Sequence, residues 1–176
     1  MLQTAGNATL IALYNSDYTS LVRLAALLVR DVASAELIVQ EAFTALCRSD
    51  QNRDAESVRR FLHQLIVRRS RSVVRRRAGA HRHTGTPSPS DARRACAPDQ
   101  LAIISALWRL KARQREVVIL RHYADLSDRQ IAAATQLSRG SVRRSLRRGV
   151  AALGLVLAAE PESSGSDGTA GSSLSP

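Results

Sequence analysis

Arginine is the residue type whose abundance most clearly indicates a chemistry for this sequence. Of the 26 basic residues in the 176-residue chain, 25 are arginine, and the other is Lys111. A guanidinium group can donate two parallel hydrogen bonds to a phosphate or to the edge of a guanine base. Together with a formal net charge of +11 at pH 7, this composition predicts a polyanionic partner.

A row of polar side chains recurs at helical spacing in the middle of the chain: Arg60, Gln64, Arg68, Arg71 and Arg75. Exposed helix faces usually mix acidic and basic residues, because opposite charges at i and i+4 attract. Here like charges repeat, and residues 57–90 contain nine arginines and no acid. The repulsion favours an anion bound along this face, with a merely solvated face as the alternative.

A second set of basic residues follows a pattern typical of a helix-turn-helix. The S-x-x-Q segment 127–130 predicts a capped helix start, and Ser138 can cap another helix after a turn at 135–137. Val142 and Leu146 would hold that last helix against its neighbour. Its exposed side would carry the residues that contact bases and phosphates. These residues are Arg139, Ser141, Arg143, Arg144, Arg147 and Arg148. The alternative is a structural helix pair with solvated arginines.

One position of this turn departs from the usual pattern. The turn often needs a residue with positive φ, and glycine is common there because it adopts that conformation without strain. This sequence has Gln136 instead, which predicts local strain or a slightly different turn.

Helical periodicity accounts for the rest of the ordered chain, and no alternating strand pattern bounded by turn residues occurs. The sequence therefore predicts an all-α fold. The first part would hold a helix ending near Arg30, a second helix capped by Ser34 and a third capped by Ser57. The second part would hold two short helices, around residues 101–108 and 117–123, followed by the helix-turn-helix.

Composition suggests where the domain boundaries lie. Glycine, proline and serine are frequent between Gly79 and Pro98, which favours a flexible linker. We expect two small helical domains, at residues 1–77 and 99–159, joined by a basic linker at 78–98. A Gly/Ser-rich acidic tail at 160–176 is too polar to fold by itself.

The motifs of several other classes of protein are missing from the sequence. Without a glycine-rich phosphate loop, an HExxH or GxSxG motif, or a His/Cys cluster at metal spacing, we expect no enzyme activity, no cofactor and no metal. Cys47 and Cys96 lack CxxC spacing and are expected to be reduced thiols. Since no apolar run is long enough to span a membrane and no signal-peptide pattern occurs, a cytoplasmic protein without membrane insertion is expected.

Two stretches of the sequence match the motifs of a known family. The first is SAELIVQEAF at 34–43, and the second is RQREVVILRHY at 113–123, continued by SRGSVR at 138–143. On these motifs the chain resembles bacterial RNA polymerase sigma factors of the sigma-seventy family. It is most similar to the extracytoplasmic-function (ECF) group, which keeps only conserved regions 2 and 4. Residues 10–77 look like region 2 and residues 101–153 look like region 4.

The resemblance implies that the protein directs RNA polymerase core to promoters for transcription initiation. Region 2 would bind the β′ coiled coil of core through Glu36, Gln40 and Glu41. It would also open the minus-ten element, where the arginine row 60–75 would follow the DNA backbone. Region 4 would read the minus-thirty-five element of promoter DNA with its last helix and touch the β flap. An anti-sigma factor could be a further partner.

Three residues depart from the family pattern. Leu37 replaces a usual acid, Cys47 replaces a common aromatic residue, and Lys111 replaces the usual proline at a helix start. Losing a carboxylate at a polar interface costs about 1 kcal/mol, so weakened binding to core is expected.

Two other functions stay open at this stage. One is a helix-turn-helix transcriptional regulator that does not act as a sigma factor and uses its first part for dimerisation or sensing. The other is an interaction protein that holds core or an anti-sigma factor without reading DNA. Binding that weakens steeply with salt would favour the DNA-reading functions, because each phosphate contact releases counterions.

Overall fold

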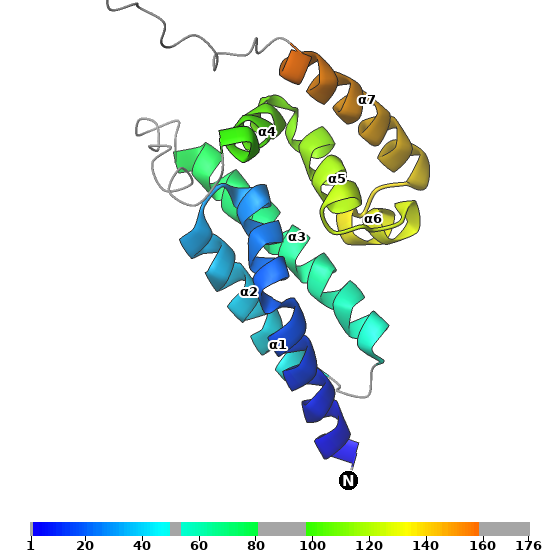
Figure 1. The fold of residues 1–176 in the computed structure, drawn as a ribbon. Helices are drawn as coiled ribbons and strands as arrows, with labels where there is room; N and C mark the ends of the chain where they lie inside the picture. The colour runs from blue at the N-terminus through cyan, green and yellow to red at the C-terminus, as the bar shows by residue number, and fades with distance from the viewer. Residues whose placement is uncertain (1, 50–53, 81–97, 159–176) are drawn as a thin grey trace, which may run out of the picture.

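The computed structural model describes residues 2–49, 54–80 and 98–158, and every regular element in these ranges is a helix. The described elements, shown in Figure 1, are α1 (Leu2–Val29), α2 (Val32–Cys47), α3 (Ala55–Ala80), α4 (Pro98–Arg109), α5 (Ala112–His122), α6 (Asp128–Thr135) and α7 (Arg139–Ala158). The predicted all-α class is confirmed. Most of the expected linker, and the expected tail, lie outside the described residues.

Helices α1, α2 and α3 form the first half of the protein and pack against one another. The predicted apolar stripe of Leu21, Leu24 and Leu28 on α1 is buried, and Leu62 and Ile66 of α3 belong to the same core. Each such side chain contributes about 1.5–3 kcal/mol when fully buried. This core fixes α3 alongside α1 and α2 (Figure 1), and so decides which of its arginines face outward.

The predicted caps of α2 and α3 are wrong by three residues. The N-cap of α2 is Asp31, whose carboxylate accepts a 2.9 Å hydrogen bond from the Ser34 amide. At the start of α3, the carboxylate of Asp54 accepts a 2.8 Å bond from the Ser57 amide. Both serines are therefore the donors of a cap rather than the caps. A carboxylate is favoured at these positions because it also interacts with the positive end of the helix dipole.

Helices α4 to α7 form the second half, in which α7 packs along α5. Ser127 and Gln130 form the predicted capping box at the start of α6. Gln136 has φ 57° and ψ 35°, so the positive φ expected of that turn position is present without a glycine. Ser138 accepts a 3.2 Å bond from the Ser141 amide, as expected of a cap. Val142 is fully buried, and it anchors α7 in the predicted helix-turn-helix.

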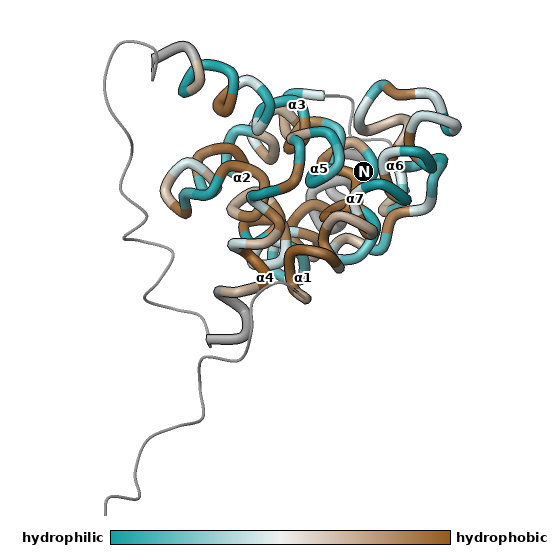
Figure 2. Tube along the Cα trace, turned by 90° about the horizontal axis from the view of Figure 1, so that it is seen from above, coloured by the Kyte–Doolittle hydropathy of each residue, from teal (hydrophilic) through white to brown (hydrophobic). Residues whose placement is uncertain are grey.

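The two halves also pack together, because α3 lies against α6 and α1 touches α5. Figure 2 shows apolar and hydrophilic stretches alternating along the helices, as expected when each helix buries one face. None of the described helices combines the length and apolar character needed to cross a membrane. The domain boundaries proposed from the sequence remain a prediction.

Candidate nucleic-acid interface

Helix α7 presents its arginines in two rows on the face opposite its buried residues. Arg139, Arg143 and Arg147 follow at four-residue intervals, and Arg144 and Arg148 form the neighbouring row. All five are exposed, whereas Val142 and Gly149 on the opposite face are buried. Ser141 is half-buried. The structure thus brings the predicted set together on one surface of the helix-turn-helix.

Arg143 is held in place by an ion pair with the preceding helix. Its Nε donates a 2.9 Å hydrogen bond to the Asp128 carboxylate, although the Arg143 side chain stays 72% exposed. An exposed pair of this kind contributes at most about 1 kcal/mol. The pair orients Arg143 and can be given up at little cost.

Most arginines of the row on α3 are exposed to solvent, and one of them contacts the second half. Arg60, Arg68 and Arg75 are exposed, and Gln64 is half-buried. Arg71 instead points at the second half. Its Nε and Nη2 donate to the two carboxylate oxygens of Glu116 at 2.8 and 2.7 Å, and its Nη1 donates to the Thr135 carbonyl at 2.8 Å. The Arg71 side chain nevertheless stays 40% exposed, so its assignment to DNA binding stays a prediction.

Other arginines of α3 hold the first half together, a role that the sequence analysis missed. Arg59 pairs with Asp17 of α1 at 2.7 Å, and Arg69 pairs with Glu41 of α2. Arg77 donates to the Asp31 carboxylate at 2.8 Å and to the Val29 carbonyl at 2.9 Å. The available signal was the excess of acids in residues 1–56, which hold seven acids and four arginines. Carboxylates of the first half itself therefore neutralise part of the positive charge of α3.

The three residues predicted to bind polymerase core are all exposed on α2. Glu36 and Gln40 face solvent, and Glu41 does so while it pairs with Arg69. Leu37 lies among them with 59% of its surface exposed. The structure therefore places an exposed apolar side chain beside these three polar residues.

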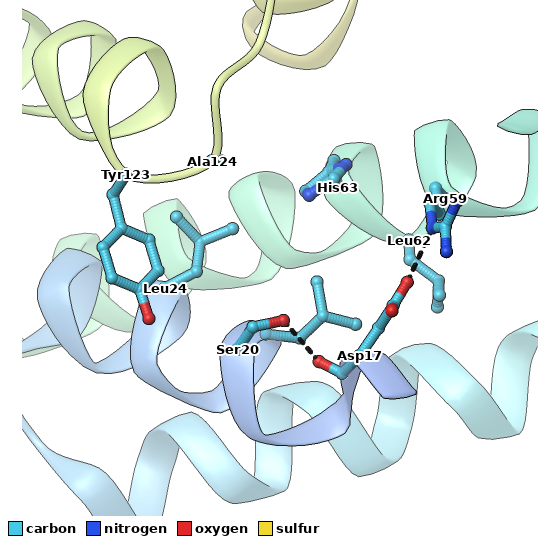
Figure 3. Close-up of a pocket in the computed structure, with 9 residues that line it drawn as sticks. Asp17, Ser20, Leu24, Arg59, Leu62, His63, Tyr123 and Ala124 are labelled. Carbon is cyan, nitrogen blue, oxygen red and sulfur yellow. Dashed lines mark hydrogen bonds and ion pairs between the residues drawn. The ribbon is translucent and has the colours of Figure 1, made fainter. Parts of the chain in front are cut away.

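A cavity of about 290 Å³, lined by both polar and apolar side chains, lies between the two halves. Figure 3 shows Asp17 and Ser20 of α1, Arg59 and His63 of α3, and Tyr123 from the end of α5 around it. Burial lowers the pKa of His63. Partial burial would raise the pKa of Asp17, but hydrogen bonds from Arg59 and Ser16 lower it on balance.

A second cavity of about 260 Å³ adjoins the first, since Arg59, His63 and Ala124 line both. No group of His, Cys, Asp and Glu side chains in the described part of the chain could hold a metal ion. The exposed arginines of α7 and α3 are groups on the described surface that can bind an anion.

The second half of the chain matches a known family model, and most of the chain matches a curated relative. Residues 100–153 match the family described as Sigma-70, region 4. The chain is 32% identical over 161 residues to the ECF RNA polymerase sigma factor SigL of Mycobacterium tuberculosis. That match covers 85% of this chain and 89% of SigL.

Two solved structures share the fold at low sequence identity. One shows CnrH in complex with the cytosolic domain of CnrY, with a TM-score of 0.64, 22% identity, and coverage of 86% of this chain and 88% of CnrH. The other shows the sigma factor RpoE in complex with the anti-sigma factor NepR from Bartonella quintana. Its TM-score is 0.65 at 20% identity, and the match covers 90% of this chain and 97% of that one.

Proposed function

Because the chain belongs to the extracytoplasmic-function group of RNA polymerase sigma factors, we propose a division of tasks between its two halves. The protein directs promoter-specific initiation of transcription and is not an enzyme. In our proposal α7 reads the minus-thirty-five element, the exposed arginines of α3 contact the minus-ten element, and α2 binds polymerase core in the cytoplasm. The observation that carries the proposal is the pair of exposed arginine rows on α7.

The geometry of α7 supports base reading near its start and phosphate contact further along. In a helix-turn-helix, the N-terminal residues of the second helix approach base edges in the major groove, and later residues approach the backbone. Arg139 and Arg143 lie in the first two turns, and Arg147 and Arg148 lie in the third. Arginine forms two hydrogen bonds with guanine O6 and N7, so a guanine-containing site is expected.

A binding selection tests the role of α7. The chain bound to core polymerase would select sites from randomised duplexes, and the Arg143→Ala variant would repeat the selection. We expect preference to relax at one base position, by about 1–3 kcal/mol. Arg113→Ala, which removes an exposed arginine of α5 outside the helix-turn-helix, is the matched control. An unchanged preference in the Arg143 variant would place the reading surface elsewhere.

The role of α3 is tested by the salt dependence of binding to promoter DNA. Arg75→Ala should weaken binding to forked promoter DNA by a similar factor for all sequences and reduce the salt dependence, because a phosphate contact is lost. The matched control is Arg76→Ala, which removes an exposed neighbour on a different face of α3. If the two variants bind alike, the row that ends at Arg75 is not the contact surface.

The β′ coiled coil and the β flap of core are the proposed polymerase partners, with Glu36, Gln40 and Glu41 facing the former. An anti-sigma factor is a further proposed partner, supported by the CnrY and NepR complexes of the two similar structures. Promoter-dependent transcription by purified core plus this chain tests the whole proposal. DNA binding without core binding would favour a helix-turn-helix regulator instead.

A further inference from the structure

Three side chains that are far apart in sequence meet where the end of α1 lies beside α4 (Figure 1). Trp108 of α4 is half-buried, and the guanidinium of Arg115 of α5 lies 3.7 Å from the centre of its ring. The guanidinium of Arg30, which follows α1, lies 5.6 Å from the same centre. The face of an indole ring attracts cations at such distances. We call these three residues the tryptophan cluster.

The two arginines of the tryptophan cluster have no carboxylate partner among the described residues. Arg115 is only 8% exposed, and its side chain makes one long hydrogen bond, of 3.4 Å, to the Leu110 carbonyl. Burial lowers the pKa of Arg115 against the opposing effect of Glu116, and the positive charge of Arg30 lowers it further. Because a buried charge without a hydrogen-bonded counter-ion is costly, an anion would stabilise this cluster.

The acids that flank the two arginines in sequence pair with other arginines. Asp31 accepts a 2.8 Å hydrogen bond from Arg77, and both carboxylate oxygens of Glu116 accept from Arg71. Arg77 also donates to the Val29 carbonyl at 2.9 Å, so it adds a positive charge close to the end of α1. The surroundings of the tryptophan cluster therefore stay positively charged.

The N–H groups of the tryptophan cluster that lack acceptors are accessible to a small ligand. Within the described part of the chain, the indole N–H of Trp108 and most N–H groups of Arg115 have no hydrogen-bond acceptor. The side-chain polar atom that is fully buried there without a partner is Ser70 Oγ, so these N–H groups reach solvent. A phosphate group has enough oxygens to accept from two guanidiniums and an indole together, and arginine binds it through parallel hydrogen bonds.

We propose that the tryptophan cluster is a binding site for the phosphate group of a small molecule, either free phosphate or the phosphate end of a nucleotide. The phosphate accepts hydrogen bonds from the guanidiniums of Arg30 and Arg115 and from the indole N–H of Trp108. The site is separate from the proposed DNA-contacting surfaces, because none of its three residues belongs to α3 or α7. The inference therefore goes beyond the proposed function.

Titration of the full chain with sodium phosphate, at an ionic strength held constant with chloride, tests the site. The readout is the single indole N–H resonance of the chain, because Trp108 is the only tryptophan. We expect a saturable shift of this resonance. Arg30→Gln removes an exposed charge and should weaken binding at least about tenfold. Arg48→Gln, which removes an exposed arginine after the other end of α2, is the matched control and should bind like the parent chain.

A second variant tests the geometry of the site. Arg115→Lys keeps the positive charge but loses the planar fork of donors. We expect it to bind phosphate more weakly than the parent chain, and circular dichroism would show that the variant is folded. Since Arg30 is exposed, the Arg30 variant tests the inference even if the Arg115 variant does not fold.

Three further ligands distinguish the sources of the phosphate. Tighter binding of adenosine diphosphate than of pyrophosphate supports a nucleotide, whereas equal affinity supports free phosphate. Adenosine, which lacks a phosphate, should leave the resonance unchanged. The inference is overturned if no phosphate ligand gives a saturable shift, or if the Arg30 and Arg48 variants lose affinity equally. A shift that only a short DNA duplex produces would assign the cluster to nucleic acid and also overturn it.

Discussion

Gln136 is the residue at which the backbone of the helix-turn-helix carries strain. It is exposed, and its φ of 57° and ψ of 35° lie in the left-handed region. That region costs a residue with a Cβ atom about 1–2 kcal/mol. Its amide donates to the Ala132 carbonyl and ends α6, so the conformation is required by the turn and not by the side chain.

We expect Gln136→Gly to raise the free energy of unfolding by about 0.5–1 kcal/mol, because relief of the strain outweighs the greater entropy of glycine in the unfolded chain. Urea denaturation of the full chain would measure the change. Gln136→Ala removes the same exposed side chain and keeps the strain, so it should give no gain. Equal stability of the two variants would contradict the prediction.

Leu37 is the second residue whose replacement should improve the protein. The Leu37→Asp substitution restores an acid to a surface of exposed polar residues, and the leucine contributes little packing because it is 59% exposed. We expect affinity for polymerase core to rise about fivefold, equivalent to about 1 kcal/mol. Titration of labelled chain with core measures this. Ile11→Asp on α1, where the isoleucine is 60% exposed, should leave the affinity unchanged.

Single residues could be assigned to a face from the sequence, but their partners could not. The row from Arg60 to Arg75 was predicted from spacing alone, because helical geometry fixes which residues share a side. The partner of Arg71 is 45 residues away, and no periodicity encodes a pair at that separation. The sequence therefore predicted a basic face and missed that Glu116 covers part of it.

At the scale of elements, α5 and α7 approach each other closely at Gly149. A Cβ atom there would lie 2.7 Å from Val118 Cγ2 and 3.3 Å from the Gln114 carbonyl oxygen. The close crossing is what lets α7 pack along α5 and turn its arginine rows to solvent. Glycine is required here because a Cβ atom would clash with α5, and not because the backbone has a positive φ.

Gly149→Ala should lower the free energy of unfolding by about 1–3 kcal/mol, because the added methyl group overpacks the crossing. The matched control is Gly154→Ala, further along the same helix, where nothing lies within 4 Å of the added Cβ. That variant should gain about 0.5–1 kcal/mol from the higher helix propensity of alanine. Destabilisation of both variants to the same extent would show that the crossing at Gly149 is not tight.

The helices themselves were largely predictable, since their apolar residues recur with the helical period. The capping box at Ser127 was predicted correctly because both of its partners lie within one turn. The starts of α2 and α3 were misplaced because Asp31 and Asp54 compete with a serine three residues later for the role of cap. Both residue types favour that position, so propensity does not choose between them.

At the scale of the whole molecule, a histidine lines both cavities between the two halves. His63 faces Asp17 of α1, Glu56, Arg59 and Arg60 of its own helix, and Asp125 and Gln130 beyond α5. Burial lowers its pKa from the ordinary value of 6.5, against the opposing effect of Asp17 and Glu56. The folded state therefore favours neutral His63.

We expect acidification to lower the free energy of unfolding. A group whose pKa is lowered in the folded state contributes its stabilisation fully above its ordinary pKa, and that contribution is lost as the pH falls through the lowered value. The free energy of unfolding, measured by urea denaturation between pH 7.5 and pH 5, should fall below about pH 6.5. His63→Gln should flatten this dependence. A variant that loses stability as steeply as the parent would assign the dependence to other groups.

The packing of the two halves could not be predicted, because the contacts that form it join residues far apart in sequence. Apolar periodicity predicts which face of a helix is buried, but it does not tell whether a basic face meets solvent, DNA or another part of the chain. The packing joins arginines from the first half to acceptors in the second, and only the structure shows it.

The position of Trp108 gives the protein a built-in optical reporter. Trp108 is the only tryptophan of the chain. Arg115 of the same half lies 3.7 Å from its ring centre, and Arg30 of the other half lies 5.6 Å away. Separation of the halves removes one of these two cations and admits water to the indole. A change in emission wavelength would therefore follow opening in the unlabelled, unmodified chain, at concentrations suited to stopped-flow mixing with promoter DNA.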